Sequence, residues 1–355
     1  MFSFIMTVEI VSDPQRAQWD AVFASVVVPA VNQTWEWGEA MRTIKGVQPI
    51  RLLATCDGKP SGVLQAFEWK IGPLSMAISS GESGDGGGPV VSGDVPAGKR
   101  KDIAVKLLEV LADEAKKRST LKFTVYGSPE FGANLPAIGK LNIATKCTPV
   151  IELLSDPEQM LNEKVDQKAR NQITKSEKNG VTVREGSRDE LAAYRSIQHG
   201  LTEKKRLERT HLNSLSSLQH LWDALASKGM IKLWLAEKDG RVIGGALILY
   251  AGKGLLYRSG VLTEEGRDCY AGNALQWQII ADAIRRGYRT YNMCGGTTNE
   301  SDSLYGITKF KMSFGGEMRE FRRYSAGGNR ILRFLAYRLR RMFGRNEWFP
   351  LLIYP

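Results

Sequence analysis

Two widely separated segments carry the same pattern of apolar strand, tight turn and apolar strand. They are residues 51–67, RLLATCDGKPSGVLQAF, and residues 231–250, IKLWLAEKDGRVIGGALILY. Each contains an Asp-Gly pair between apolar runs, which is typical of a two-residue hairpin turn because both residues accept a positive φ. The pattern therefore predicts one β-hairpin in each half of the chain.

Each predicted hairpin is followed, after an intervening segment, by an amphipathic helix and a short strand. The helices are predicted at residues 103–118 and 273–286, and the strands at residues 121–126 and 289–293. Apolar side chains recur every three or four residues along both helices, as packing against a sheet requires. Two copies of the same order of elements, half a chain apart, indicate a duplicated α/β unit with mixed sheets.

A polar turn at Ser155-Asp156-Pro157 is the predicted boundary between the two copies. The predicted domains are residues 1–155, residues 156–326 and a C-terminal tail of residues 327–355. Within the second domain, long helical stretches are predicted over residues 158–179 and 189–227.

Composition argues against a disulfide framework and against a metal site. The four cysteines form no C-x-x-C pair, and the three histidines show no ligand spacing; they are Cys56, Cys147, Cys269, Cys294, His199, His211 and His220. The apolar N-terminus lacks the basic region of a signal peptide and is predicted to be a first strand. Without a run of 18 apolar residues, no transmembrane helix is expected, and a cytoplasmic location is predicted.

Positive charge is concentrated near the C-terminus. Residues 309–345 contain eleven Lys and Arg against two Glu, a net of +9 within a formal chain charge of +11. Residues 329–345, NRILRFLAYRLRRMFGR, place apolar side chains on one helical face with arginines around it. This predicts a basic amphipathic C-terminal helix, with residues 329–349 as a contact for an anionic membrane at the inner face of the plasma membrane. Packing on the protein itself remains the alternative.

Three segments carry a family likeness. They are QTWEWGEAM at residues 33–41, KARNQITKSEKNGVTV at residues 168–183, and GITKFKMSFGG at residues 306–316. Together they resemble the Fem family of peptidoglycan peptidyltransferases. The resemblance implies two domains of the GCN5-related acetyltransferase (GNAT) fold. It also implies transfer of an amino acid from aminoacyl-tRNA to an amine of a cell-envelope precursor, which can be lipid-linked.

The chain departs from the family pattern at two places. Where relatives usually carry Asp before paired glycines, this chain has Asn292, followed by Met-Cys-Gly-Gly. No long coiled-coil arm interrupts the second half. Related branches use other acyl donors, so the resemblance leaves the transferred group open.

The resemblance also implies donor-site residues. Lys311 corresponds to a lysine that lies by the reacting end of the donor, where a cation would stabilise the developing negative charge. We therefore predict Lys311 as the catalytic residue. Phe310 and Lys309 are predicted to bind the donor, the former by stacking. No cofactor is expected to be bound permanently.

Four residues are predicted to bind the acceptor. Tyr257 matches a family tyrosine that faces this substrate, and Trp37 could form an apolar wall of the same site. Arg206 and Arg209 suit a diphosphate, because a guanidinium group binds phosphate oxygens in a bidentate way.

The donor itself remains open between aminoacyl-tRNA and acyl-CoA. Residues 267–272, RDCYAG, carry Tyr270 where acetyl-CoA enzymes have the first glycine of a pyrophosphate loop, which disfavours acyl-CoA. Another Gly-rich segment, residues 81–89, lacks the Lys-Ser/Thr of a P-loop and is predicted to be a flexible loop. The alternatives are an acyl-CoA-dependent N-acyltransferase and a non-catalytic double-GNAT module that binds RNA or membrane.

Overall fold

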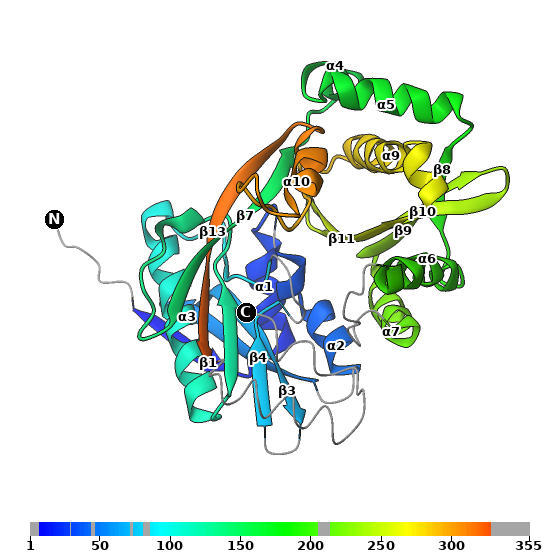
Figure 1. Cartoon of the computed structure of the whole chain (residues 1–355). Coiled ribbons are helices and arrows are strands. Elements are labelled where there is room, and N and C mark those ends of the chain that lie inside the picture. The colour runs from blue at the N-terminus through cyan, green and yellow to red at the C-terminus, as the bar shows by residue number, and fades with distance from the viewer. Residues whose placement is uncertain are drawn as a thin grey trace. The chain divides into compact units, whose positions relative to one another are not determined.

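The computed structural model describes residues 7–28, 30–43, 47–71, 74–80, 86–204 and 214–327. The chain divides into two compact units (Figure 1). The first unit comprises Met1–Lys146 and Glu320–Pro355, and the second comprises Cys147–Arg319. The predicted basic helix in the tail, residues 328 onward, lies outside the described residues.

The first unit is a mixed sheet with the strand order β1-β2-β3-β4-β6-β13, and β5 pairs with β3. The pair β4 and β6 is parallel, and the other neighbours whose register is resolved in this unit are antiparallel. Its elements are β1 (Val8–Ser12), α1 (Arg16–Ala24), η1 (Val31–Gln33), α2 (Trp35–Thr43), β2 (Val47–Cys56), β3 (Lys59–Ile71), β4 (Leu74–Ile78), β5 (Val90–Val91), α3 (Ala97–Lys117), β6 (Lys122–Tyr126), η2 (Gly132–Asn134) and the end of β13 (Gly316–Gly327).

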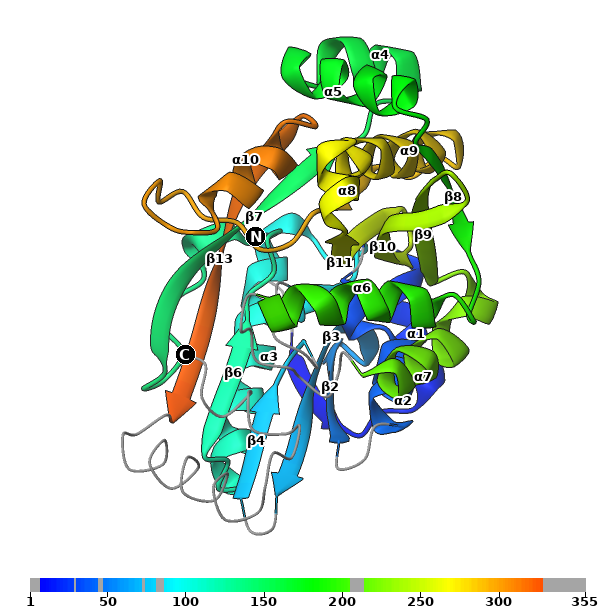
Figure 2. The same ribbon diagram turned by 45° about the vertical axis from the view of Figure 1, so that its right-hand side comes forward.

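The second unit has the strand order β7-β12-β11-β10-β9-β8, with β11 and β12 as its parallel pair. Helix α9 covers one face of the sheet and α6 the other (Figure 1), and α5 packs on α9 (Figure 2). Its elements are the end of β7 (Asn142–Glu152), α4 (Pro157–Glu163), α5 (Gln167–Lys178), β8 (Thr182–Gly186), α6 (Leu191–Lys204), α7 (Leu215–Leu225), η4 (Ala226–Lys228), β9 (Ile231–Lys238), β10 (Arg241–Ala251), β11 (Gly254–Leu262), α8 (Glu264–Asp268), α9 (Ala271–Arg285), β12 (Thr290–Asn292) and α10 (Tyr305–Met312).

The two units repeat one topology. Each starts with an edge strand and two helices, continues with three antiparallel strands, and closes with a crossover helix and a parallel strand. The crossover helix is α3 in the first unit and α9 in the second. This order confirms the predicted pair of mixed-sheet α/β units.

The units divide at other places than the sequence indicated. The predicted boundaries were residues 155 and 326, whereas the compact units change at Cys147 and again at Glu320. The reason is that the sixth strand of each sheet crosses a boundary. Strand β13 ends by pairing with β6 of the first unit, and β7 ends by pairing with β12 of the second.

The predicted hairpins and crossover helices are confirmed. Asp57 and Gly58 in one turn, and Asp239 and Gly240 in the other, all have positive φ. Gly287, with φ of 74°, ends α9.

The helical stretch predicted over residues 158–179 holds two helices, α4 and α5, with an interruption between them. The Asp166 amide donates to the Ser313 carbonyl at 2.8 Å instead of continuing the helix. The stretch predicted over residues 189–227 holds α6 and α7, with residues 205–213 outside the described part.

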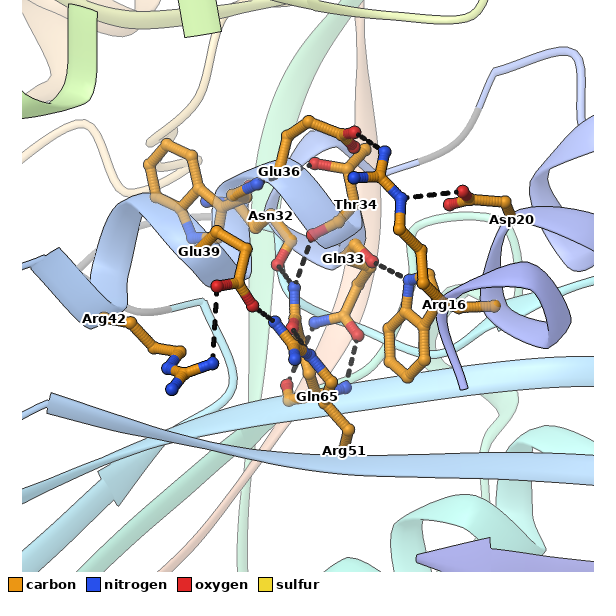
Figure 3. A network of polar contacts seen from close by, with 12 residues as sticks. Arg16, Asp20, Asn32, Gln33, Thr34, Glu36, Glu39, Arg42, Arg51 and Gln65 are labelled. Carbon is orange, nitrogen blue, oxygen red and sulfur yellow. Dashed lines mark hydrogen bonds and ion pairs between the residues drawn. The ribbon is translucent and has the colours of Figure 1, made fainter. Parts of the chain in front are cut away.

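A buried polar network fixes α2 against the first sheet (Figure 3). The Arg51 guanidinium lies 3.7 Å from the centre of the Trp35 ring and donates to Glu39 at 2.7 Å. Gln33 and Gln65 bond reciprocally: the Gln33 carboxamide accepts from the Gln65 backbone amide at 2.6 Å and donates to its carbonyl at 3.1 Å. Because these buried groups satisfy one another, the segment from η1 to α2 is held in one position.

Arg51 and Arg42 both contact Glu39, but the Arg51 side chain is 8% exposed and that of Arg42 is 53% exposed. We expect Arg51→Met to lower the free energy of unfolding by about 1–3 kcal/mol, because it leaves buried polar partners unsatisfied. The matched change Arg42→Met should cost less than about 1 kcal/mol. Urea denaturation of both variants measures the difference, and equal losses would contradict this account.

Candidate functional site

The most distinctive charged group in the second unit is Lys311 on α10. Its side chain is buried, with 8% of the residue exposed. The ammonium donates to the carbonyl oxygens of Cys294 and Gly295, the latter at 2.9 Å. The ring of Tyr257 lies 5.9 Å from the Nζ atom. The ammonium is therefore held by neutral carbonyl groups beside an aromatic ring.

The carbonyls that hold Lys311 belong to a strained turn after β12. Cys294 and Gly295 have φ values of 53° and 48°, both in the left-handed region. The Asn292 carboxamide oxygen accepts from the Cys294 amide at 2.9 Å and from the Thr148 hydroxyl at 2.6 Å. A left-handed residue other than glycine costs about 1–2 kcal/mol, so the surrounding bonds must hold it there.

The two neighbours of Lys311 in the sequence lie differently. Phe310 is half-buried and packs against the hydrophobic core of the second unit. Its ring meets the Phe314 ring edge-on, with 5.3 Å between the ring centroids. Lys309 is exposed, with its Nζ 5.6 Å from the centre of the Tyr305 ring. Their predicted roles in donor binding stay predictions, and the Lys309 side chain is the one at the surface.

Tyr257 lies on β11 just after this strand leaves β12. The two strands pair only over three residues, 254–256 with 290–292, whereas β11 continues to Leu262. Arg258 is an extra residue in the pairing with β10, a β-bulge of the kind that re-aims side chains near active sites. Burial raises the pKa of the Tyr257 hydroxyl well above its usual range, so the phenol is neutral at physiological pH.

The divergence of β11 from β12 leaves the outer edge of β11 without a strand partner beyond Leu256 in the described residues. We call the region where β11 and β12 part the gap. Tyr257 lies on its β11 side, and the turn that holds Lys311 lies on its β12 side. Such an edge can bond an extended ligand that carries amide groups.

Comparison with known proteins identifies the type of domain in the second unit. Residues 163–302 match the family model described as an acetyltransferase (GNAT) domain, a range that lies within the second unit. Lipid II:glycine glycyltransferases of Staphylococcus epidermidis and Staphylococcus saprophyticus are 28% identical over 142 and 147 residues. The match covers 39% of this chain and only about a third of the length of these relatives, 33% and 34% respectively.

Solved structures extend the likeness across both units. The crystal structure of FemX has a TM-score of 0.65 at 18% identity, over 88% of this chain and 96% of that one. A tandem GNAT protein from the clavulanic acid pathway has a TM-score of 0.52 at 13% identity, over 90% of this chain and 98% of its own. The Fem-family resemblance is confirmed. The tandem GNAT fold is confirmed with it.

The structure describes two of the four residues predicted to bind the acceptor. Trp37 is completely buried in the first unit, and its indole N–H donates to the Ser80 carbonyl at 3.0 Å. Its side chain is therefore part of the core, and a role in acceptor binding stays untested. Arg206 and Arg209 lie outside the described residues. Tyr257 is the predicted acceptor residue that the structure brings next to Lys311.

The helix that would meet a pyrophosphate group in an acetyl-CoA enzyme starts irregularly here. Tyr270, just before α9, has a φ of 59°, a conformation that favours glycine. The Lys175 ammonium lies 5.9 Å from the centre of its ring. The tyrosine is thus fixed at the position where the sequence analysis expected it to crowd a pyrophosphate.

In the first unit, the corresponding gap is filled by the chain itself. Beyond the paired residues of β4 and β6, the Ser79 amide donates to Thr124 at 3.1 Å. A Cβ atom at Gly87 would lie 2.5 Å from the Ser80 nitrogen, and one at Gly88 would lie 2.4 Å from the Ser128 nitrogen. The described part of the Gly-rich segment, predicted as a flexible loop, is therefore packed between the ends of the two strands.

Sequence reasoning missed the residues that support the turn whose carbonyls accept from Lys311. The roles of Asn292 and Thr148 depend on a contact between residues 144 positions apart. Gly260 was also missed: a Cβ there would lie 1.8 Å from the Tyr257 hydroxyl. The paired glycines after Asn292 were the one visible signal, since consecutive glycines mark unusual backbone conformations.

Two absences concern the described ranges only. No group of three or more His, Cys, Asp or Glu side chains there could hold a metal ion. Among the same residues, no helix is long and apolar enough to cross a bilayer.

The packed glycines predict an asymmetry between two alanine substitutions. Gly88→Ala should lower the free energy of unfolding by about 1–3 kcal/mol, because the added methyl group meets backbone atoms. Gly98, in the first turn of α3, has no heavy atom within 4 Å of an added Cβ. Gly98→Ala should leave stability unchanged or raise it by up to about 1 kcal/mol. Thermal unfolding of both variants tests this, and an unaffected Gly88→Ala protein would show that the gap is not filled.

Proposed function

We propose that this protein is an N-acyltransferase of the Fem type. It transfers an aminoacyl group to an amine of a cell-envelope precursor, in the cytoplasm at the inner face of the membrane. The observation that carries the proposal is the buried Lys311 ammonium, held by two carbonyls beside Tyr257 where β11 and β12 diverge. The filled gap in the first unit supports a single reaction site per chain.

The chemistry requires few protein groups. Attack of a neutral amine on an activated ester forms a tetrahedral oxyanion. The carbonyl then reforms as the ester oxygen leaves, and the surplus proton of the amine passes to that oxygen, which leaves as a hydroxyl group. A fixed cation next to that oxyanion lowers the barrier because it needs no reorganisation during the reaction. Lys311 takes this role, and no covalent nucleophile from the protein is required.

The acceptor in this proposal is a lipid-linked peptide that carries a free amine. Support comes from the curated relatives, which are named lipid II:glycine glycyltransferases and match 39% of this chain. Tyr257 contributes a neutral phenol, suited to hydrogen-bond the incoming amine, and the centre of its ring lies 5.9 Å from the Lys311 ammonium.

The donor in this proposal is an aminoacyl-tRNA. Tyr270 in a left-handed conformation disfavours the close backbone approach that a CoA pyrophosphate needs. An acyl-CoA donor is the second candidate, favoured by one observation: the unpaired edge of β11 could bond the amide groups of an extended pantetheine arm.

Removing the Lys311 charge should abolish most transfer. We expect Lys311→Met to lower kcat by about 10²–10³-fold, because one stabilising group for the oxyanion is lost while the aliphatic stem stays. The measurement is transfer of radiolabelled glycine from glycyl-tRNA to purified lipid II, repeated with acetyl-CoA in place of the tRNA. The control is Lys116→Ala, an exposed lysine on α3. Undiminished transfer by the Lys311→Met protein would disprove the role.

The raised pKa of Tyr257 makes a separate prediction about pH. The neutral form of a group with a raised pKa persists as pH increases, so this phenol does not titrate below its usual value of about 10. Tyr257→Phe should therefore reduce kcat by about tenfold or less, the worth of a neutral hydrogen bond, and keep the shape of the pH–rate profile between about pH 6 and 9. Loss of the basic limb of the profile in the variant would instead identify Tyr257 as a general acid.

A further inference from the structure

The Asn292 side chain sits at the root of the turn that holds Lys311. Its single carboxamide oxygen accepts two hydrogen bonds, from the Cys294 amide at 2.9 Å and from the Thr148 hydroxyl at 2.6 Å. Thr148 is fully buried on β7, so the second bond ties the turn to a neighbouring strand of the same unit. The oxygen therefore links the turn to a buried residue of β7.

The turn needs such a link because its conformation is unfavourable. Cys294 is a non-glycine residue in the left-handed region, and its neighbour Gly295 has the freedom to leave that region. A hydrogen bond from residue i+2 to an Asn side chain is a turn that stabilises this kind of backbone. Backbone bonds from Met293 to Pro149 and from Gly296 to Cys147 anchor the two ends of the turn on β7. The Asn292 acceptor adds a side-chain bond that holds the Cys294 amide between them.

The position of the Lys311 ammonium depends on the turn in its place. Two of its three N–H donors go to the carbonyls of Cys294 and Gly295, the two left-handed residues. A buried ammonium must keep hydrogen-bond acceptors, so it follows these carbonyls when they move. A displacement of about 1 Å at a reacting group can cost about 100-fold in rate.

We propose that Asn292 is a positioning residue for Lys311. It acts through the Cys294-Gly295 turn and touches neither substrate. Its catalytic consequence rests on the proposed function of Lys311, whereas its structural coupling to Lys311 does not. The chemistry that matters is one oxygen acceptor at the end of β12, which either a carboxamide or a carboxylate can supply.

Three variants separate this role from general damage. Asn292→Ala removes the acceptor, Asn292→Asp keeps an oxygen in the same place, and Asn299→Ala is the matched control. Asn299 accepts from the Ser301 amide at 3.1 Å in a similar turn, whereas the carbonyls that accept from Lys311 belong to Cys294 and Gly295. With glycyl-tRNA and lipid II as substrates, we expect Asn292→Ala to lower kcat by up to about 100-fold with little change in either KM.

The other kinetic results follow from the same chain of contacts. Asn292→Asp should recover most of the lost kcat, and Asn299→Ala should behave as wild type. In a Lys311→Met background, Asn292→Ala should have no further effect on kcat. A raised donor KM with normal kcat, or no recovery in Asn292→Asp, would overturn the proposal.

A second readout does not depend on activity. Melting temperatures of Asn292→Ala, Lys311→Met and the double variant form a cycle. Coupling predicts that the double variant melts no lower than the less stable single variant, because both changes release the same turn. Additive shifts would disprove the link between the two residues. If the wild-type protein transfers nothing, the proposed function fails, and non-additive shifts still establish that Asn292 holds Lys311.

Discussion

The short parallel pairing of β11 with β12 is the constraint on which the second unit's site depends. Three residue pairs join the strands, and beyond them the two backbones separate. Groups from β11 and groups from the turn after β12 therefore face a common space. The Lys311 ammonium, from α10, donates to the turn after β12 and lies 5.9 Å from the centre of the Tyr257 ring on β11. One ammonium therefore contacts groups from both strands.

The same topology gives a different result in the first unit. There the parallel pair β4 and β6 also stops after three residues, but the Ser79 hydroxyl accepts from the Tyr126 amide at 3.1 Å and glycine backbone packs into the remaining space. Two units with one strand order thus differ in what lies where the parallel strands part: glycine backbone in the first, and the turn that holds Lys311 in the second. The fold alone does not determine function in such a chain. Function depends on the side chains at the point where the parallel strands of each unit separate.

The sequence predicted those parts of the fold that depend on neighbouring residues. Asp-Gly pairs specify hairpin turns by their own conformational preference. The spacing of apolar residues within α9 indicates a helix without reference to any other part of the chain. The break between α4 and α5 was not predictable, because the Asp166 amide bonds Ser313, far along the chain. Likewise, a family motif singled out Lys311, but the acceptors of its ammonium come from a turn held by Thr148, and no local pattern encodes that contact.

The exchange of sixth strands between the units has a consequence for biosynthesis. Strand β7 is translated before the rest of the second sheet, so that sheet can close as soon as β12 leaves the ribosome. The first sheet obtains β13 only after the whole second unit has been made, and until then β6 is an open edge. Completion of the first sheet therefore waits for a strand from the far end of the chain.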